Sequence, residues 1–195
     1  IIRNITLANY KYSHKIKNKN SLKIIYFGRV HPKKNILFAI QALKNLLTSS
    51  KSLDIKFDIY GSVEDKEYYN LINDQLDDNI TFKGPYDNKD LNLILSNYDI
   101  SVFPTQGENY GHTIIESLSH GLPVIISQHT PWSEIDGSSG FVVGLSQNEF
   151  NKRVLDFYKM DSELFNEFRV NATQFTNELI DDDLIVKYVD LFSNF

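Results

Sequence analysis

Two glutamates flank a glycine-containing turn in the sequence GENYGHTIIE, residues 107–116. Paired carboxylates such as Glu108 and Glu116 can act as acid and base on a glycosidic bond. The segment after Gly111, however, has the spacing of a helix, and free amides at a helix start bind anions such as phosphates. The stretch therefore predicts either acid–base catalysis or anion binding, and its surroundings must decide between the two.

Three cations, Arg29, Lys33 and Lys34, occur in a second short stretch, GRVHPKKN (residues 28–35), which follows an apolar run. Gly28 allows a tight turn, and the guanidinium of Arg29 presents a fork that matches phosphate oxygens. Lys34 adds a mobile point charge beside the next helix start, although Lys33 is an adjacent candidate for this role. We expect Arg29 and Lys34 to bind an anionic ligand.

The two glutamates differ in the roles that the pattern allows them. The sequence TIIE, starting at Thr113, matches a capping box, in which the glutamate reaches back to the cap amide. Glu116 is therefore either a helix cap or a ligand contact, and the pattern leaves both readings open. Glu108 precedes the turn, where capping does not account for it, so we expect Glu108 to be functional.

Apolar runs that end at glycine or proline alternate with segments of helical spacing along the chain. The expected strands are KIIYF, IKFDIYG, NITFKG, DISVFP, LPVIIS and GFVV. The expected helices cover residues 35–50, 64–76, 88–98 and 112–121, and the pattern after residue 147 is helical throughout. This alternation predicts an α/β fold: a Rossmann-like, doubly wound parallel sheet of about six strands with helices on both faces, plus C-terminal helices.

The same fold class predicts where a ligand binds. In open α/β sheets ligands bind outside the carboxyl ends of the strands, so the segments that follow the strands should meet at one edge. The glycines, the two cations and both glutamates all lie in or next to such segments. We therefore expect one binding site at this edge.

Composition excludes several classes of protein. The formal net charge of −5 argues against a nucleic-acid binder. There is no cysteine, no run long enough to span a membrane and no signal-peptide pattern, which together favour a cytoplasmic location, with the inner face of the membrane as an alternative. The sequence lacks the glycine motifs of dinucleotide dehydrogenases and P-loop nucleotidases. No metal site is expected, because the histidines lack ligand spacing and Asp181–Asp183 is predicted to cap a helix start.

Several segments together resemble a known family. In order and spacing, FGRVHPKKN, IYG, ITFKGPY, LSNYDISVFPTQGENYGHTIIESLSHGLPVI and DGSSGFVV resemble the C-terminal domain of retaining family-4 glycosyltransferases, the glycosyl transferases group 1 with a GT-B fold. The resemblance extends from Lys23 to Val143. Its most specific parts are the E-x7-E pattern of Glu108 and Glu116, the Gly-Leu-Pro-Val that follows it, and G-R-x4-K at residues 28–34.

The resemblance implies a role for each matching residue. Arg29 and Lys34, next to Gly28, would hold the diphosphate of a nucleotide-sugar donor. Glu108 would contact hydroxyls of the transferred sugar, and Glu116 the ribose. Glu108, Arg29 and Lys34 are the implied catalytic residues. The remaining implied donor contacts are Lys83, whose turn KGPY would lie near the base, and the amides of Tyr110, Gly111, His112 and Thr113.

The implied function is transfer of a hexose-type sugar, with retention, from a UDP-, GDP- or ADP-sugar to a glycan or lipid-linked acceptor, without a tightly bound cofactor. Residues 1–22 are expected to be a linker and residues 23–195 the donor-binding domain. An N-terminal domain outside this chain would bind the acceptor and provide any membrane association. The alternatives are a non-catalytic nucleotide-sugar binding module and a sugar-nucleotide epimerase or hydrolase of related fold.

The sequence departs from the family pattern in three places. Gly61-Ser62-Val63 keeps one glycine of a frequent G-x-G, and Asn35 stands where glycine is common. TPWSE, residues 130–134, replaces a loop that is usually rich in glycine. We expect this last departure to alter the edge of the site near the sugar.

Overall fold

The computed structural model describes residues 17–18 and 20–193, with side chains to residue 179. The strands are β1 (Leu22–Phe27), β2 (Ile55–Tyr60), β3 (Ile80–Gly84), β4 (Ile100–Phe103), β5 (Val124–Ser127) and β6 (Gly140–Val143). The helices are α1 (Ile36–Ser49), α2 (Lys66–Asn73), α3 (Leu91–Leu95), α4 (His112–Ser119), α5 (Gln147–Lys159) and α6 (Ser162–Ser193). Three short 3-10 turns are η1 (Pro32–Lys34), η2 (Asn88–Asp90) and η3 (Ser133–Ile135).

The six strands form one parallel sheet in the order β3-β2-β1-β4-β5-β6. The order changes direction after β3, so β1 is flanked by β2 and by β4. In the register of the sheet, Ile24 of β1 lies between Phe57 of β2 and Ile100 of β4. All three side chains are buried, as expected for central strands of a sheet covered on both faces.

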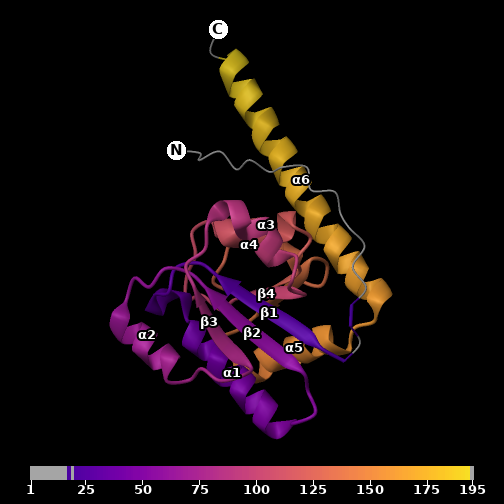
Figure 1. Cartoon of the computed structure of the whole chain (residues 1–195). Coiled ribbons are helices and arrows are strands. Elements are labelled where there is room, and N and C mark those ends of the chain that lie inside the picture. Colours follow the sequence, from indigo (N-terminus) through magenta and orange to yellow (C-terminus); the bar gives the residue numbers. More distant parts are fainter. Residues whose placement is uncertain (1–16, 19, 194–195) are drawn as a thin grey trace.

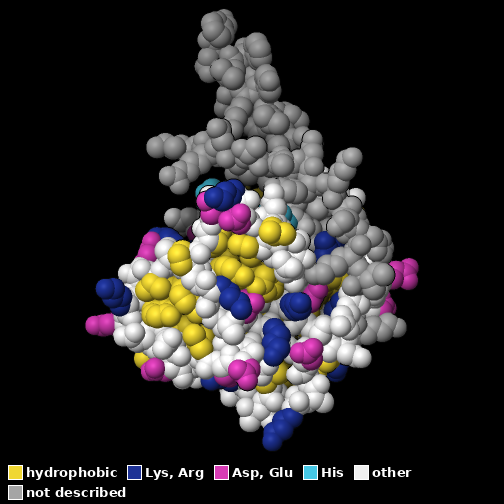
Figure 2. Space-filling model, in the orientation of Figure 1, with side chains coloured by type: hydrophobic (Ala, Val, Ile, Leu, Met, Phe, Trp, Pro, Cys, Tyr) yellow, Lys and Arg dark blue, Asp and Glu magenta, His cyan; other side chains and the backbone are white. Residues whose placement is uncertain are grey.

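Helices cover the sheet in two layers (Figure 1). α1 packs against α2 and α5 on one face, while α3 and α4 lie on the other, where α4 also packs against α6. The predicted Rossmann-like sheet with helices on both faces is therefore confirmed. Over the face seen in Figure 2, charged side chains of both signs are interspersed and apolar side chains gather in patches between them.

The sequence predicted the presence of the helices better than it predicted where they begin and end. α2 is shorter than its predicted range, since it begins after the cap Asp65, whose side chain accepts a hydrogen bond from the Tyr68 amide at 2.8 Å. The predicted helix at 88–98 is split into η2 and the short α3. Asp181–Asp183 do not start a helix as predicted, because α6 runs through them.

The predicted capping box at Thr113 is wrong. α4 begins at His112, its cap residue is Gly111, and no side chain caps it. Thr113 thus lies inside the helix and is not its cap residue. The sequence pattern was misleading because a glycine can take the left-handed cap conformation without any side-chain partner.

The predicted linker, residues 1–22, lies mostly outside the described residues. Within the described part of the chain, no helix combines the length and the apolar composition needed to cross a membrane.

Candidate donor site

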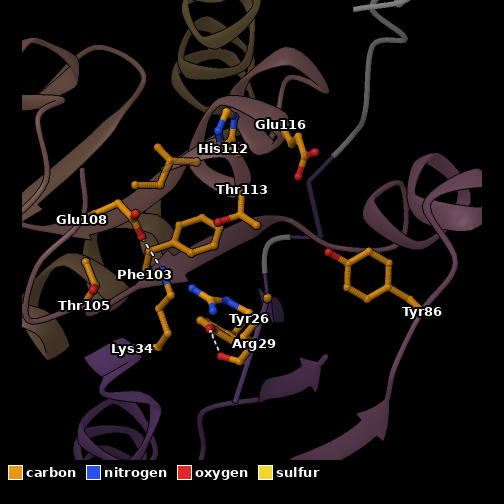
Figure 3. Close-up of a pocket in the computed structure, with 12 residues that line it drawn as sticks. Tyr26, Arg29, Lys34, Tyr86, Phe103, Thr105, Glu108, His112, Thr113 and Glu116 are labelled. Carbon is orange, nitrogen blue, oxygen red and sulfur yellow. Dashed lines mark hydrogen bonds and ion pairs between the residues drawn. The ribbon is translucent and has the colours of Figure 1, made fainter. Parts of the chain in front are cut away.

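A pocket of about 320 Å³ lies at the carboxyl ends of β1 and β4. These two strands are neighbours at the point where the strand order reverses, which is where open α/β sheets bind ligands. The pocket is lined by Tyr26, Gly28, Arg29, Lys34, Tyr86, Phe103, Thr105, Glu108, His112, Thr113, Ile114 and Glu116 (Figure 3). Cations therefore approach it from the β1 side, and carboxylates and a helix start from the β4 side.

Lys34 is positioned by the turn η1 that follows β1. His31 caps this turn by accepting a hydrogen bond from the Lys33 amide at 3.2 Å, and Pro32 supplies its first residue. Asn35 then adopts a left-handed conformation (φ 56°), which asparagine tolerates better than most residues, and α1 starts directly after it. Lys34 is thereby held at the pocket, whereas Lys33 does not line it.

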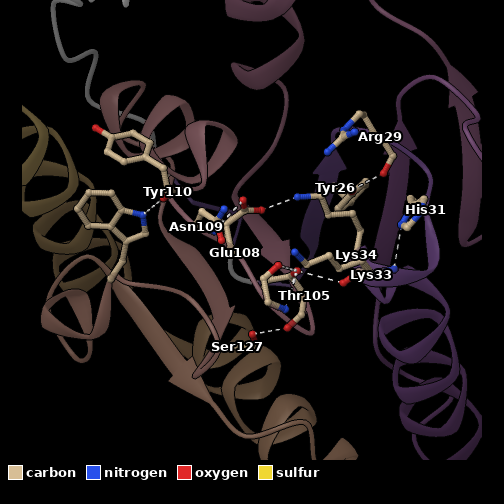
Figure 4. Close-up of polar contacts among 12 residues, drawn as sticks. Tyr26, Arg29, His31, Lys33, Lys34, Thr105, Glu108, Asn109, Tyr110 and Ser127 are labelled. Atoms are coloured by element: carbon tan, nitrogen blue, oxygen red, sulfur yellow. Dashed lines mark hydrogen bonds and ion pairs between the residues drawn. The ribbon is translucent and has the colours of Figure 1, made fainter. Parts of the chain in front are cut away.

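The backbone ties this turn to the loop after β4 (Figure 4). The carbonyl of Lys33 accepts hydrogen bonds from the Gln106 amide at 2.9 Å and from the Thr105 hydroxyl at 3.1 Å. As a result Lys34 and Glu108 meet in an ion pair, with only 19% and 21% of their side chains exposed. Two residues far apart in the sequence are therefore fixed side by side at the pocket.

The start of α4 offers backbone donors to the same pocket. Gly111 has a φ of 81°, a left-handed conformation that favours glycine, and a Cβ added there would also lie 2.9 Å from Cδ1 of Ile114. The amides of Ile114 and Ile115 donate to the Gly111 carbonyl. Among the described residues those of His112 and Thr113 donate to no acceptor. These two amides, together with the helix dipole, favour an anion here.

Glu116 lies deeper along α4, on the side of the pocket that faces Tyr86 (Figure 3). Its carboxylate makes no hydrogen bond with the described residues, and burial raises its pKa above the usual value. Burial also raises the pKa of Tyr86 to about 12, with the Glu116 charge as a second cause. Of the two readings of Glu116, the cap is excluded, since α4 begins before Thr113.

Arg29 extends over the pocket from the end of β1 (Figure 3). One of its nitrogens, Nη1, lies 3.1 Å from both carboxylate oxygens of Glu64. The carbonyl of Arg29 accepts a hydrogen bond from the Tyr26 hydroxyl at 2.8 Å. The side chain is 63% exposed, so Arg29 keeps most of its donors accessible to a ligand.

The structure does not bring every predicted residue to the pocket. Lys83 lies 3.5 Å from Asp58 in an ion pair, and it does not line the pocket. From the same turn, Tyr86 does. Tyr110 and Gly111 also stand outside the lining, although the carbonyl of Tyr110 is held by the indole N–H of Trp132.

Sequence reasoning missed three lining residues that come from the strand ends. Tyr26 and Phe103 belong to apolar runs and were read as core, and Thr105 was read as loop. Their position within two residues of the carboxyl end of a strand was the available signal. Tyr26 and Phe103 form an aromatic floor of the pocket, with their ring centroids 6.0 Å apart.

A six-stranded parallel sheet covered by helices on both faces, with a pocket at its reversal point, defines a Rossmann-like α/β domain. Residues 21–160 match the family model of glycosyl transferases group 1, and the chain belongs to this family. The predicted family is thereby confirmed, while the retaining family-4 subclass remains a prediction.

Curated relatives are similar over most of this chain. The UDP-Gal:alpha-D-GlcNAc-diphosphoundecaprenol alpha-1,3-galactosyltransferase of Escherichia coli is 27% identical over 183 residues, which cover 88% of this chain and 44% of that protein. The GtfA subunit of the UDP-N-acetylglucosamine–peptide N-acetylglucosaminyltransferase of Streptococcus pneumoniae is 25% identical over 181 residues, 89% of this chain and 35% of that protein. The chain thus spans less than half the length of these relatives.

Solved structures share the fold. TarM superimposes with a TM-score of 0.75 at 21% identity, over 94% of this chain and 37% of TarM. Anabaena HepE, solved in complex with UDP and glucose, gives a TM-score of 0.70 at 18% identity, over 88% of this chain and 48% of HepE. At these identities the likeness supports the fold alone.

Proposed function

We propose that this chain is the donor-binding half of a glycosyltransferase that uses a nucleoside diphosphate sugar. The observation that carries the proposal is the meeting of Arg29, Lys34 and the α4 amides with two carboxylates in one pocket. A diphosphate needs concentrated positive charge, and a sugar or ribose needs hydrogen-bond acceptors for its hydroxyls. The pocket offers both, and relatives named for UDP-sugar substrates are consistent with it.

The proposed chemistry follows from where charge develops. Cleavage of the bond between sugar and phosphate builds negative charge on the departing diphosphate. Arg29, Lys34 and the amides of His112 and Thr113 would stabilise this charge more in the transition state than in the bound donor. Because these donors are already in place, little reorganisation accompanies the reaction.

The carboxylates are assigned to hydroxyl groups. Glu108, beside Lys34, would accept hydrogen bonds from the transferred sugar, which we propose is a hexose moved with retention to a glycan or lipid-linked acceptor. Glu116, nearer Tyr86, would accept from the ribose. The ion pair between Lys34 and Glu108 places the diphosphate and sugar contacts next to each other. An acceptor would bind opposite this pocket, on a second domain.

The direct test is a thermal-shift panel of UDP, GDP and ADP at millimolar concentration, with the matching nucleosides as controls. At least one diphosphate should raise the unfolding midpoint by several degrees, since a ligand that binds only the folded state stabilises it by mass action. The nucleosides should do much less. If none of the diphosphates shifted the unfolding midpoint, the proposed donor site would be contradicted. A separate assay of sugar transfer to an acceptor by the complete enzyme distinguishes a transferase from a non-catalytic binding module.

Replacing Arg29 by alanine tests the phosphate assignment. Arg29→Ala should weaken the diphosphate that binds best about tenfold, the size of a lost charge-assisted contact, and leave the nucleoside unchanged. Titration calorimetry of both ligands gives the comparison. Lys44→Ala, which removes a lysine paired with Asp77 away from the pocket, controls for the change in net charge. Equal losses for diphosphate and nucleoside would refute the assignment.

A further inference from the structure

The loop that carries Glu108 depends on a neighbouring loop for its position. Residues 105–111, after β4, are contacted at two points by residues 127–129, at the end of β5. The Ser127 hydroxyl donates to the Thr105 carbonyl at 2.5 Å (Figure 4). The Glu108 amide donates to the His129 carbonyl at 3.0 Å. Together with the Lys33 contacts described above, these bonds fix the first half of the loop.

The second half of the loop is held by Trp132, from the TPWSE sequence. Its indole N–H donates to the Tyr110 carbonyl, and the indole packs edge-on against the Tyr110 ring with centroids 5.2 Å apart. On another side the indole packs edge-on against Phe175 of α6, at 5.9 Å. Trp132 is 7% exposed, so its indole is shielded from water.

The Tyr110 carbonyl, which accepts the hydrogen bond from Trp132, immediately precedes the turn at Gly111. The peptide that carries the Tyr110 carbonyl joins Tyr110 to Gly111, so its orientation sets the left-handed turn with which α4 begins. That turn aims the amides of His112 and Thr113 at the pocket. It also abuts Glu108, since a Cβ at Gly111 would lie 3.1 Å from Cγ of Glu108.

We infer that Trp132 is a positioning residue, which orients the Gly111 turn and thereby places Glu108 and the α4 amides for the diphosphate sugar. A tryptophan used only as core filling would need its rings but not its N–H. Here the N–H bonds the one carbonyl that precedes the turn. The inference deepens the proposed function, and it assigns a purpose to the loop in which this chain departs from the glycine-rich family pattern.

The first test needs no ligand. Trp132→Phe keeps an aromatic ring against Tyr110 and Phe175 but removes the donor. Hydrogen–deuterium exchange of peptides that cover residues 107–113 should then speed up about tenfold, because the turn opens more often. Phe175→Leu, which keeps the N–H bond and loosens only the packing, should leave the exchange of this segment near that of the unchanged chain. Unchanged exchange in Trp132→Phe would overturn the inference, whether or not the chain binds a nucleotide.

The second test uses UDP, or the diphosphate that binds best in the thermal-shift panel. Trp132→Phe should bind it about tenfold more weakly while binding the nucleoside as before, because only the phosphates reach the α4 amides. If Trp132→Phe bound the diphosphate as tightly as the unchanged chain does, Trp132 would only fill the core and the inference would be overturned. If the unchanged chain binds no diphosphate, the proposed function fails, and the exchange experiment still decides the role of Trp132.

A third measurement applies if Trp132→Phe does not fold. The chain has one tryptophan, so a ¹⁵N-labelled sample gives a single indole N–H resonance. Saturating diphosphate should move this resonance, since the indole bonds the peptide at the anion site, and the nucleoside should leave it in place. A resonance that does not move at saturation would overturn the inference.

Discussion

At the scale of single residues, Glu116 is a group whose charged form is disfavoured by burial in the fold. Its carboxylate is partly buried without a hydrogen-bond partner among the described residues, and burial raises its pKa above the ordinary value of 4.5. The folded chain therefore holds this proton more tightly than the unfolded chain does. Stability linked to Glu116 is fully present at pH below 4.5 and is lost as the pH rises through the raised, folded-state pKa.

Glu116→Gln should therefore change stability and binding in opposite directions. The variant should match the unchanged chain in unfolding free energy at low pH and exceed it increasingly as the pH rises, with a constant gain once the carboxylate is fully ionised. Affinity for the nucleoside should fall about five- to tenfold through the lost ribose contact. Urea unfolding between pH 4 and 8 and calorimetry measure the two effects.

The matched control is Glu67→Gln, which neutralises an exposed carboxylate in the first turn of α2. It should show no gain that grows with pH. A gain in Glu116→Gln that does not depend on pH, or an unchanged nucleoside affinity, would disagree with the assignment of Glu116.

Much of the pocket could be predicted from residue types, because the charged residues follow strands whose carboxyl ends meet where such sheets bind ligands. Arg29, Lys34, Glu108 and Glu116 are brought together as expected. The aromatic floor could not be predicted, because an apolar residue at the end of a buried strand has the same sequence signature as core. The ion-pair partners of the charged residues could not be predicted either, because nothing in the sequence near Arg29 indicates that Glu64 lies beside it.

At the scale of elements, the turns after β1 and β2 touch at two glycines. A Cβ at Gly61 would lie 1.7 Å from the carbonyl oxygen of Gly28, far inside contact distance, and the φ of Gly61 is 152°. Gly28 lines the pocket, so the turn after β2 packs directly against a segment that forms the pocket wall. The one glycine kept from the family's G-x-G is thus the one that the packing requires.

Gly61→Ala should lower the unfolding free energy by about 3 kcal/mol or more, because backbone must move to admit the methyl group. Gly137→Ala is the control: its φ is also positive, at 77°, but a Cβ there meets nothing within 4 Å. It should cost about 1–2 kcal/mol, the penalty of the left-handed conformation alone. Denaturant unfolding of both variants measures the difference, and similar losses would show that the contact with Gly28 is not the cause.

Helix starts show the limit of local patterns. Asp65 caps α2 through its side chain, as its residue type suggests. At α4 the sequence TIIE satisfies the capping-box pattern, yet the helix begins before Thr113 because Gly111 and the grip on Tyr110 set the turn. The capping-box pattern considers only the residues of the helix start itself. It cannot take into account a contact from another loop, here that of Trp132, which helps to set where α4 begins.

At the scale of the whole molecule, the alternation of strands and helices was enough to predict a parallel sheet covered on both faces. The order of the strands was not predictable in the same way. Alternation is equally compatible with other orders, and the one observed depends on which face each crossover helix covers. The position of the pocket between β1 and β4 became definite only with that order.

The order also predicts how protection from solvent is distributed. β1 lies at the centre of the sheet with nearly all its side chains buried, whereas β3 is at the edge and partly exposed. Backbone amides of β1 should exchange with deuterium at least about tenfold more slowly than those of β3, as exchange there requires global unfolding. Peptide-resolved exchange measures this, and equal rates in the two strands would contradict the described sheet.

The pairing of β1 with β4 has a consequence for synthesis at the ribosome. Ile24 leaves the ribosome well before its partner Ile100, which follows only after two further strands and three α-helices. Until then one side of β1 is an unpaired, apolar edge, which is a hazard for aggregation in nascent chains. The pocket forms later still, once Glu116 has emerged, so a ligand bound there can stabilise only chains that have already passed this vulnerable stage.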